Sequence, residues 1–426
     1  MTFYVFSLGC KVNSYESRAV AQQLISLGYK EVSYKENADI VIINTCSVTA
    51  TADQKSRQHI RKFINQYPNA IVVVMGCYSQ GNYEFIDKNI KPAILLGTDY
   101  RNEIPSLIEE YLKTKERIIK INKNRASYSY NEFGVISYSE NVRAYLKIQD
   151  GCDNFCTYCI VPFRRGKMRS RELKDVINEA EYLIKLGYKE IVLTGIHVGG
   201  YGQDLGYVTF SELVDQLTMI PGLESLRISS IEESEIDEKL VSLYKTRKNL
   251  APHIHIPLQS GSTSVLKRMN RKYTAEEFIN KLKSLRKSLQ NVAITSDVIV
   301  GFPGETDEEF KETYDIIIKS DINMLHVFPY SAREGTIAAK MDNQIAPEIK
   351  KKRSNELLEL SKQQWKKYCS NYIGKSVEVL VEQFDEKKNA YVGHTRNYIE
   401  VKIPSGDIHI GTYVTVKQLQ LTDIIE

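Results

Sequence analysis

The sequence predicts an α/β protein made of three folded parts and a connector. Short apolar runs alternate with helical patterns up to about residue 115, the same alternation returns between residues 140 and 335, and short β-type runs follow one long helix after that. Buried strands alternating with helices are typical of parallel sheets, and closely spaced short strands are typical of small barrels. We therefore expect an N-terminal doubly wound parallel α/β domain, a central partial (βα)6 barrel and a C-terminal small OB-like β-barrel. The expected boundaries are 1–115, a linker over 116–139, 140–368 and 369–426.

The N-terminal domain is predicted from three apolar runs, Phe3–Leu8, Asp39–Asn44 and Ala70–Met75. Helical patterns follow the first two, over Ser14–Leu27 and Thr51–Gln66. Continuous apolar runs of this length indicate strands whose two faces are both covered by helices.

The central part contains six candidate strands with helical patterns between them. The strands are Ala144–Gln149, Glu190–Thr194, Ser225–Ser229, His253–Leu258, Ile294–Val300 and Met324–Pro329. A parallel barrel places its chemistry on the loops after the C-terminal strand ends, so we expect the functional residues there.

The C-terminal part begins after a basic amphipathic helix predicted over Pro347–Tyr368. Its five candidate strands are Val377–Glu382, Ala390–Gly393, Tyr398–Ile403, Asp407–Ile410 and Val414–Leu421. Five short strands in about 50 residues favour a small barrel.

Composition excludes several classes of protein. The net charge of the 426 residues is only +4, so any nucleic acid must be bound by local patches. The longest apolar run, residues 70–76, is far shorter than the roughly 18 residues that span a bilayer, and the N-terminus lacks the pattern of a signal peptide. We expect a cytoplasmic protein without a membrane segment. Seven cysteines, an odd number, then favour metal or redox chemistry over disulfides.

Three of the cysteines lie close together, as Cys152, Cys156 and Cys159, with the spacing Cys-x3-Cys-x2-Cys. Three thiolates on one loop can hold three corners of a four-iron cluster and leave one iron open to a substrate. Zinc is the alternative, but a closed zinc site needs four ligands, and no further Cys or His occurs before His197. The spacing therefore favours an iron–sulfur cluster.

This segment resembles the signature of the radical S-adenosylmethionine (SAM) superfamily, including the aromatic Tyr158 before the last cysteine. The resemblance implies that the open iron binds SAM and that one electron cleaves SAM to a 5′-deoxyadenosyl radical. Polar and glycine-rich segments follow successive predicted strands, where this superfamily contacts SAM. The residues that the resemblance assigns to SAM binding are Gly195, Ser229, Ser230, Gln259, Gly301 and Phe302.

The other N-terminal cysteines, Cys10, Cys46 and Cys77, each follow an apolar run by one or two residues. Equivalent ends of parallel strands lie along one edge of a sheet, so the three thiols could converge on one site. Spacing alone does not separate this interpretation from three unrelated buried cysteines.

With the segments 9–13, 44–46 and 76–78, the whole chain resembles the radical-SAM methylthiotransferases. The resemblance implies a second four-iron cluster on Cys10, Cys46 and Cys77, and a C-terminal RNA-binding module called TRAM. The Gly-Cys-Lys-Val-Asn segment is most similar to the enzymes that convert N6-threonylcarbamoyladenosine to its 2-methylthio form. The implied partners are the anticodon stem-loop of tRNA, modified at adenosine 37, an electron donor such as flavodoxin or ferredoxin, and a sulfur source.

Three alternatives remain open at this stage. Two are related enzymes that act on isopentenyladenosine in tRNA or on an aspartate of a ribosomal protein. The third is a non-catalytic iron–sulfur RNA-binding protein, although a structural cluster would normally have a fourth protein ligand.

A basic segment directly after the cluster loop favours RNA. Residues 161–171 carry five positive charges and no acid, and we expect them to contact phosphates beside the active site. They are Arg164, Arg165, Lys167, Arg169 and Arg171. A solvated loop is the alternative. Residues 371–426, by contrast, carry six basic and eight acidic residues, a net charge of −2, so aromatic and basic side chains such as Tyr398 would have to hold RNA there.

Overall fold

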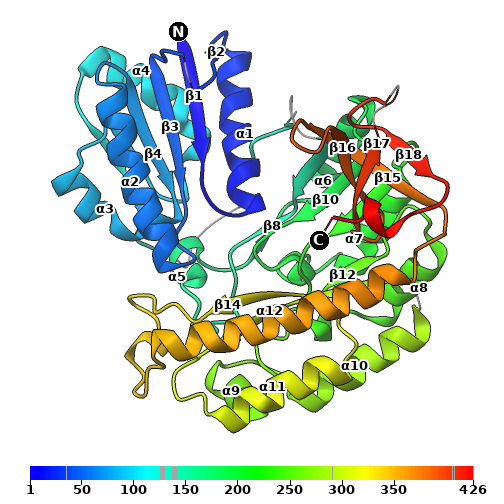
Figure 1. Cartoon of the computed structure of the whole chain (residues 1–426). Coiled ribbons are helices and arrows are strands. Elements are labelled where there is room, and N and C mark those ends of the chain that lie inside the picture. Colours follow the sequence, from blue (N-terminus) through cyan, green and yellow to red (C-terminus); the bar gives the residue numbers. More distant parts are fainter. Residues whose placement is uncertain are drawn as a thin grey trace.

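A computed structural model gives the structure of the chain and describes residues 1–34, 36–124, 130–136, 142–289, 291–404, 406 and 408–425. Figure 1 shows three parts: an N-terminal α/β domain, a central α/β domain and a small C-terminal sheet beside it. The three predicted fold classes are confirmed in this order along the chain.

The N-terminal domain is a six-stranded, wholly parallel sheet in the order β2-β1-β3-β4-β5-β6. Its strands are β1 (Thr2–Ser7), β2 (Lys30–Glu31), β3 (Ile40–Thr45), β4 (Ile71–Gly76), β5 (Ile94–Leu96) and β6 (Ile118–Lys120). Its helices are α1 (Lys11–Ser26), α2 (Ala50–Gln66), α3 (Cys77–Asn89) and α4 (Ile104–Thr114). Every residue of β3 and β4 is buried because alternate side chains enter two separate hydrophobic clusters, one on each face of the sheet.

The range 116–139, which the sequence predicts to be a linker, differs from that expectation at its start. Strand β6 pairs with β5 and closes one edge of the N-terminal sheet. The strand is short, ends at Lys120 and lies among positively charged residues, so the sequence contains no long apolar run that would predict it. Short strands with charged residues are common at sheet edges. Residues 125–129 and 137–139 of the expected linker lie outside the described residues.

The central domain contains all six predicted strands, in two parallel three-stranded sheets, β11-β10-β7 and β12-β13-β14. Parallel bridges from Leu226 to Leu250 and from Ser230 to His255 join the β11 edge to the β12 edge, so the strands form one open barrel. The strands are β7 (Arg143–Lys147), β10 (Glu190–Thr194), β11 (Ser225–Ile228), β12 (His253–His255), β13 (Ala293–Val300) and β14 (Met324–Pro329). A separate antiparallel pair consists of β8 (Gln149–Asp150) and β9 (Arg169–Ser170).

Apart from α5 (Val161–Arg165), which packs on α3 of the N-terminal domain, the helices of the central domain lie around the outside of this barrel (Figure 1). They are α6 (Leu173–Lys185), α7 (Phe210–Thr218), α8 (Glu238–Thr246), α9 (Thr263–Arg268), α10 (Ala275–Ser288), α11 (Asp307–Lys319) and α12 (Pro347–Ser370). Helix α12 packs on β14, where the Ser361 hydroxyl accepts a hydrogen bond from the Leu325 amide at 2.8 Å.

The C-terminal part is a four-stranded antiparallel sheet in the order β17-β16-β15-β18. Its strands are β15 (Val377–Asp385), β16 (Ala390–Thr395), β17 (Glu400–Pro404) and β18 (Tyr413–Val416). Of the strand expected over residues 407–410, Asp407 lies outside the described residues and the other three form no strand. Cys369, at the end of α12, is buried in the hydrophobic cluster under this sheet, which fits a structural cysteine.

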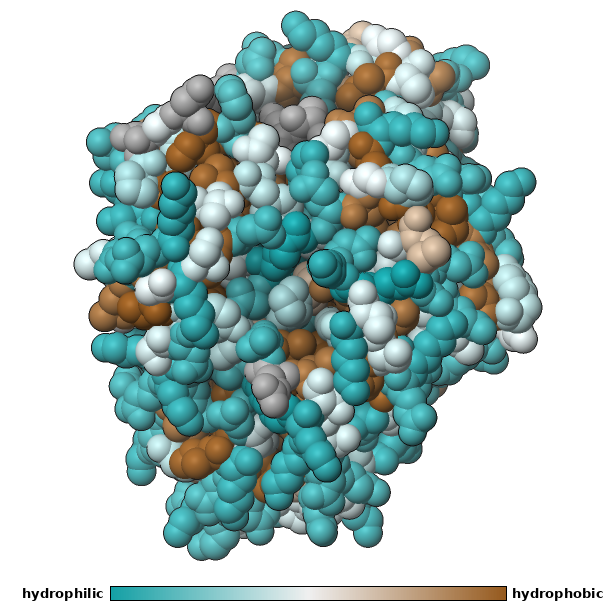
Figure 2. Space-filling view, turned by 90° about the vertical axis from the view of Figure 1, so that its right-hand side faces the viewer, coloured by the Kyte–Doolittle hydropathy of each residue, from teal (hydrophilic) through white to brown (hydrophobic). Residues whose placement is uncertain are grey.

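One hydrophobic core joins the N-terminal and central domains. Helix α1 packs against both β1 and β7, and Tyr15 on α1 donates a hydrogen bond to Glu179 on α6 at 3.0 Å. The helix therefore holds the N-terminal sheet against the barrel (Figure 1). In the part of the chain that the structure describes, none of the helices has the length and apolarity to cross a bilayer. The face in Figure 2 is mostly hydrophilic, with its hydrophobic side chains in small separate groups.

Candidate active site

The ends of three neighbouring strands bring the N-terminal cysteines together. Cys10 precedes α1, Cys46 follows β3, and Cys77 begins α3 directly after β4. Gly9 has φ +108°, and a Cβ atom there would lie 2.7 Å from the Sγ atom of Cys46. Glycine at position 9 thus gives the chain the backbone conformation it needs and leaves space beside the thiol.

Asparagine side chains fix the distance between these strand ends. The Asn13 amide donates to the carbonyl of Leu8 at 2.7 Å and to that of Thr45 at 3.1 Å. Asn44 donates in turn to the carbonyl of Asn13 at 2.9 Å. The two asparagines that accompany the cysteines in the sequence therefore tie the loops after β1 and β3 together.

The N-terminal thiol set fits an iron–sulfur cluster better than a single ion. Burial raises the pKa of Cys46 to about 11, and the neighbouring Cys77 and Cys10 act in the same direction. Thiols of this kind become ligands when a metal displaces their protons. Around one zinc ion, ligand sulfurs would lie about 3.8 Å apart, given Zn–S bonds of about 2.3 Å. Among the described residues, only His255, Asp297 and His326 come within 4.8 Å of one another as a set of three potential ligands, so the thiols are spaced too widely for one ion.

The second thiol set lies on the loop after β8, between the barrel and α5. The Cys159 amide donates to the Cys156 carbonyl at 2.9 Å, and Arg271 approaches the Sγ atom of Cys156 at 3.5 Å. Burial raises the pKa of Cys159 to about 12. The cluster loop is therefore compact, and positive charge lies beside it.

His197 supplies a second positively charged neighbour. Burial alone would lower the pKa of His197, but hydrogen bonds with Cys152 and Glu235 outweigh burial and raise it to about 10. The His197 Nε2 atom lies 2.5 Å from a Glu235 carboxylate oxygen. A protonated imidazole thus lies next to one of the three predicted cluster ligands.

The residues predicted to bind SAM fall into two groups. Gly195, Ser229 and Ser230 line one cavity of about 520 Å³. Gln149 holds the segment after β10, because its side-chain oxygen accepts hydrogen bonds from the amides of Ile196 and His197 at 3.0 and 2.8 Å.

Gln259, Gly301 and Phe302 are not part of that cavity. The Gly301 amide donates to Glu305 at 2.6 Å, and Phe302 is fully buried against Tyr330 and Val265. The Phe302 ring therefore belongs to the wall of the barrel, and only the backbone of this segment could face a ligand.

The 520 Å³ cavity is formed by all three parts of the protein. Residues 9–12 border it from the N-terminal domain, and Tyr398 borders it from the C-terminal sheet. Tyr398 has φ +76° and stacks on His253, with ring centroids 4.8 Å apart and planes at 11°. Such backbone strain in a bulky residue is concentrated at functional sites.

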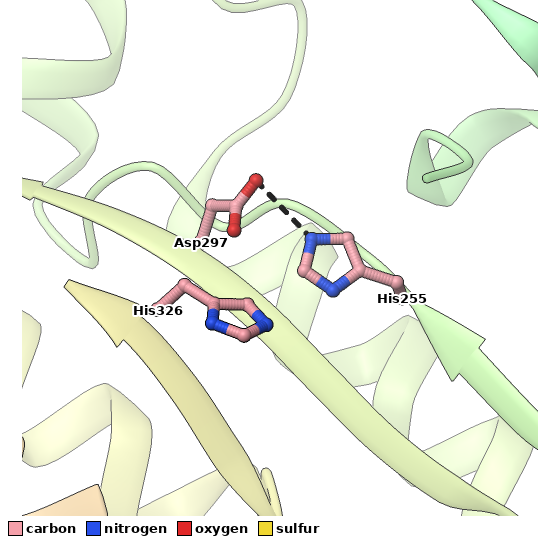
Figure 3. A group of neighbouring side chains, drawn as sticks. All are labelled: His255, Asp297 and His326. Atoms are coloured by element: carbon pink, nitrogen blue, oxygen red, sulfur yellow. Dashed lines mark ion pairs between the residues drawn. The ribbon is translucent and has the colours of Figure 1, made fainter. Parts of the chain in front are cut away.

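Sequence reasoning missed a polar cluster inside the barrel, made of His255 on β12, Asp297 on β13 and His326 on β14. Figure 3 shows the three side chains converging from neighbouring strands. The Nε2 atom of His255 lies 3.2 Å from Asp297, and its Nδ1 atom contacts the Thr295 hydroxyl at 2.8 Å. Polar residues at alternate positions of 293–300, where a packed core would be apolar, are the signal that could have revealed it.

The basic segment 161–171 differs from its prediction as an RNA-contacting surface. Arg165, Arg169 and Arg171 are no more than 4% exposed. The Arg165 guanidinium lies 2.8 Å from Glu16 and 3.0 Å from Asp150, and Arg171 pairs with Glu179 and Glu132. Arg169 lies 3.4 Å from Asp150. The three arginines therefore pair with the buried carboxylates of Glu16, Asp150 and Glu179, so the expectation that they face phosphates is wrong for this structure. Arg164 is partly exposed and Lys167 is exposed.

Comparisons with known proteins agree with this architecture. The family model described as the radical SAM superfamily matches residues 146–317, and the model described as uncharacterized protein family UPF0004 matches residues 2–97. Among solved structures, the radical S-adenosylmethionine methyltransferase TsrM from Kitasatospora setae aligns with a TM-score of 0.59 at 13% identity, covering 79% of this chain and 73% of that one. At that identity the likeness shows the fold alone. Together, the fold and the motif match define a radical SAM enzyme.

Proteins with similar sequences show to which family of radical SAM enzymes the chain belongs. Threonylcarbamoyladenosine tRNA methylthiotransferase MtaB of Bacillus subtilis is 44% identical over 418 residues, which cover 97% of this chain and 93% of the relative. The protein of the same name from Aquifex aeolicus is 36% identical, covering 93% and 95%. tRNA-2-methylthio-N(6)-dimethylallyladenosine synthase of Acetivibrio thermocellus is 35% identical, covering 96% and 87%. The chain belongs to the family of radical-SAM tRNA methylthiotransferases. Enzymes of this family use SAM and two [4Fe-4S] clusters.

Proposed function

We propose that this protein transfers a methylthio group to C2 of N6-threonylcarbamoyladenosine 37, beside the anticodon of tRNA. The observation that carries the proposal is one cavity bordered both by Cys10, of the N-terminal thiol set, and by Gly195, Ser229 and Ser230, at the barrel ends. A base in that cavity would lie between the two centres whose chemistry must meet. The names of the MtaB relatives support the choice of nucleoside.

The proposal assigns a role to each set of residues. Cys10, Cys46 and Cys77 would hold one cluster, and Cys152, Cys156 and Cys159 the other, with Gly195, Ser229, Ser230, Gln259, Gly301 and Phe302 as the proposed SAM site. When bound, these groups would supply the radical that removes hydrogen from C2 and the sulfur and methyl group that replace it. The protein's own residues position the nucleobase, and the cavity walls limit its access to water.

Other features complete the proposal. The division 1–115, 116–139, 140–368 and 369–426, with its first boundary moved past β6 to residue 120, would separate the thiol-cluster domain, a linker, the radical SAM domain and the TRAM module. Anticodon stem-loop contacts would involve Arg164 and Lys167 rather than the buried arginines. A cytoplasmic location, with a flavodoxin or ferredoxin as electron donor and a separate sulfur source, would meet the needs of the reaction.

Mass spectrometry of nucleosides from total tRNA tests the proposal. A deletion strain should lack 2-methylthio-threonylcarbamoyladenosine and accumulate its precursor, and the wild-type gene should restore the product. A variant with Cys46→Ala should not restore it. Unchanged threonylcarbamoyladenosine products in the deletion strain would refute the proposed substrate.

A second candidate is the isopentenyl nucleoside, since relatives 33–36% identical are named as dimethylallyladenosine synthases. The same spectra decide between them, because the two products differ in mass. Loss of only the isopentenyl product would favour this second candidate. A change in neither nucleoside would favour the ribosomal-protein substrate or a non-catalytic protein.

A further inference from the structure

Lys11 places an unmatched positive charge at the cavity. It is the first residue of α1 and is exposed, and it borders the cavity beside Cys10. Among the described residues, the Lys11 ammonium group has neither a hydrogen bond nor an ion pair. The first turn of α1 contains no acidic residue, so the positive end of the helix dipole adds to the same field.

Arg227, on β11, supplies a second cation in the same wall. Its side chain is 4% exposed, and it pairs with Glu190 through its Nε and Nη2 atoms, both at 2.9 Å. Its Nη1 atom is buried and has no hydrogen-bond partner among the described residues. A buried donor without a partner costs free energy unless a ligand or water accepts its hydrogen bond.

The acidic groups nearby are already paired. Glu190 forms ion pairs with Arg227 and with Arg143, whose Nε atom lies 2.7 Å from the Oε1 atom of Glu190. Asp297, the acid that lines the cavity, pairs with His255. Among the described residues that line the cavity, Lys11 therefore remains the cation without a counter-charge, and the cavity suits a ligand that brings one negative charge.

The lining also contains hydrogen-bonding side chains beyond these charges. Serine, threonine and histidine side chains make up much of the wall, with Val12, Ile228 and Phe328 as its aliphatic and phenyl members. An isopentenyl substituent carries no charge and no hydrogen-bonding group, so it would leave the Nη1 donor of Arg227 and the ammonium group of Lys11 without a partner. A threonylcarbamoyl substituent carries a carboxylate, a hydroxyl and amide groups.

We infer that Lys11 and Arg227 form a carboxylate subsite that takes the threonyl carboxylate of the substrate nucleoside and so selects it over uncharged adenosine derivatives. The inference rests on the proposed function and adds the residues that determine specificity. A phosphate of the RNA and the carboxylate of SAM share this anionic chemistry, and the experiment separates the three sources.

The experiment measures binding of anticodon stem-loop RNAs to the reconstituted enzyme without oxygen. The RNAs carry at position 37 either threonylcarbamoyladenosine, its methyl ester or plain adenosine. The enzymes are the wild type, Lys11→Gln, Lys11→Arg and, as a matched control, Lys174→Gln. Lys174 is an exposed lysine on α6 outside the cavity, so the control removes the same charge elsewhere. Iron content is measured for each protein.

The wild type should bind the free acid about 10-fold to about 100-fold more tightly than the ester or plain adenosine, the range for a hydrogen-bonded charge. Lys11→Gln should lose this preference while its affinity for plain adenosine RNA stays unchanged. Lys11→Arg should retain most of the preference, and Lys174→Gln all of it.

Other outcomes overturn the inference. If Lys11→Gln weakens the binding of all three RNAs equally, Lys11 contacts a phosphate of the RNA. If it abolishes SAM cleavage in the absence of RNA, its partner is the SAM carboxylate. If Lys11→Gln loses iron, the wild-type measurements still test the inference. Equal wild-type affinity for the RNA with the free acid and the RNA with the methyl ester would exclude a carboxylate subsite. Wild-type enzyme that binds the acid selectively but never methylthiolates it would refute the proposed function instead.

Discussion

Arg165, at the end of α5, donates its Nε hydrogen to the Sγ atom of Cys77 across 3.3 Å. The same guanidinium group binds Asn13 at 2.8 Å, and it pairs with Glu16 on α1 and Asp150 on β8. Arg165 therefore connects the N-terminal thiol set with the radical SAM domain through one buried side chain. Its charged partners come from both domains, so Arg165 fixes the position of the N-terminal cluster site relative to the cluster site of the central domain.

Replacing Arg165 by Ala should destabilise the protein by about 3–5 kcal/mol, because it leaves Glu16 and Asp150 buried with less counter-charge. Urea unfolding of the variant and the wild type measures this loss, with Lys167→Ala as an exposed control from the same segment. Normal stability together with weakened tRNA binding would contradict the buried role and restore the interpretation of Arg165 as an RNA contact.

Iron content tests the presence of two clusters. Two separate sets of three thiols should give roughly eight irons per chain after anaerobic reconstitution. Replacing Cys152, Cys156 and Cys159 together by Ala should reduce this to about four. A wild-type protein that never exceeds about four irons would exclude the N-terminal cluster.

Removing a cysteine from each thiol set should affect a different step of the reaction. Cys156→Ala removes a ligand beside the proposed SAM site and should abolish release of 5′-deoxyadenosine. Cys46→Ala should leave that release intact and abolish the methylthio product. Both quantities can be followed by mass spectrometry in one reaction. Equal loss of SAM cleavage in two well-folded variants would argue against separate roles.

The fold and the thiol sets were predictable because local patterns encode them. The apolar runs locate the strands, and Cys10, Cys46 and Cys77 each follow one of those runs, so parallel topology alone brings them to one edge. The burial of Arg165 was not predictable, because its partner Glu16 lies 149 positions away in the sequence. The cavity was missed for a similar reason: Lys11, Arg227 and Tyr398 come from three different parts of the chain.

The stability of the barrel should depend on pH through Glu190. Burial alone would raise the pKa of Glu190, but Arg227 and Arg143 outweigh it and lower the pKa to about 2 from its ordinary 4.5. A depressed pKa stabilises the folded state at pH values above about 4.5, and the contribution, about 3 kcal/mol, is lost as the pH falls toward 2.

Comparison with Glu190→Gln isolates this contribution. The variant should be less stable than the wild type near neutral pH, and their free energies of unfolding should converge as the pH falls from about 5 toward about 2. Denaturant unfolding of iron-free protein provides the measurement, since acid would otherwise release the clusters. A gap that stays constant over this range would show that Glu190 acts through packing rather than through its charge.

The last prediction concerns Lys167, the exposed member of the basic segment after the cluster loop. The carbonyl of Lys167 accepts a hydrogen bond from Arg169 at 3.0 Å, which fixes the backbone of this residue beside the buried network while its side chain remains at the surface. A phosphate contact by Lys167 releases counterions, so its loss should reduce the slope of log affinity against log salt by about one. We expect Lys167→Ala to show this reduction for tRNA binding and to retain SAM cleavage without tRNA. Lys174→Ala, which removes an exposed charge from α6, should leave the slope unchanged. The same slope for Lys167→Ala and the wild type would remove Lys167 from the RNA-binding surface and leave the partly exposed Arg164 as the remaining candidate of the basic segment, since the buried arginines already serve the domain interface.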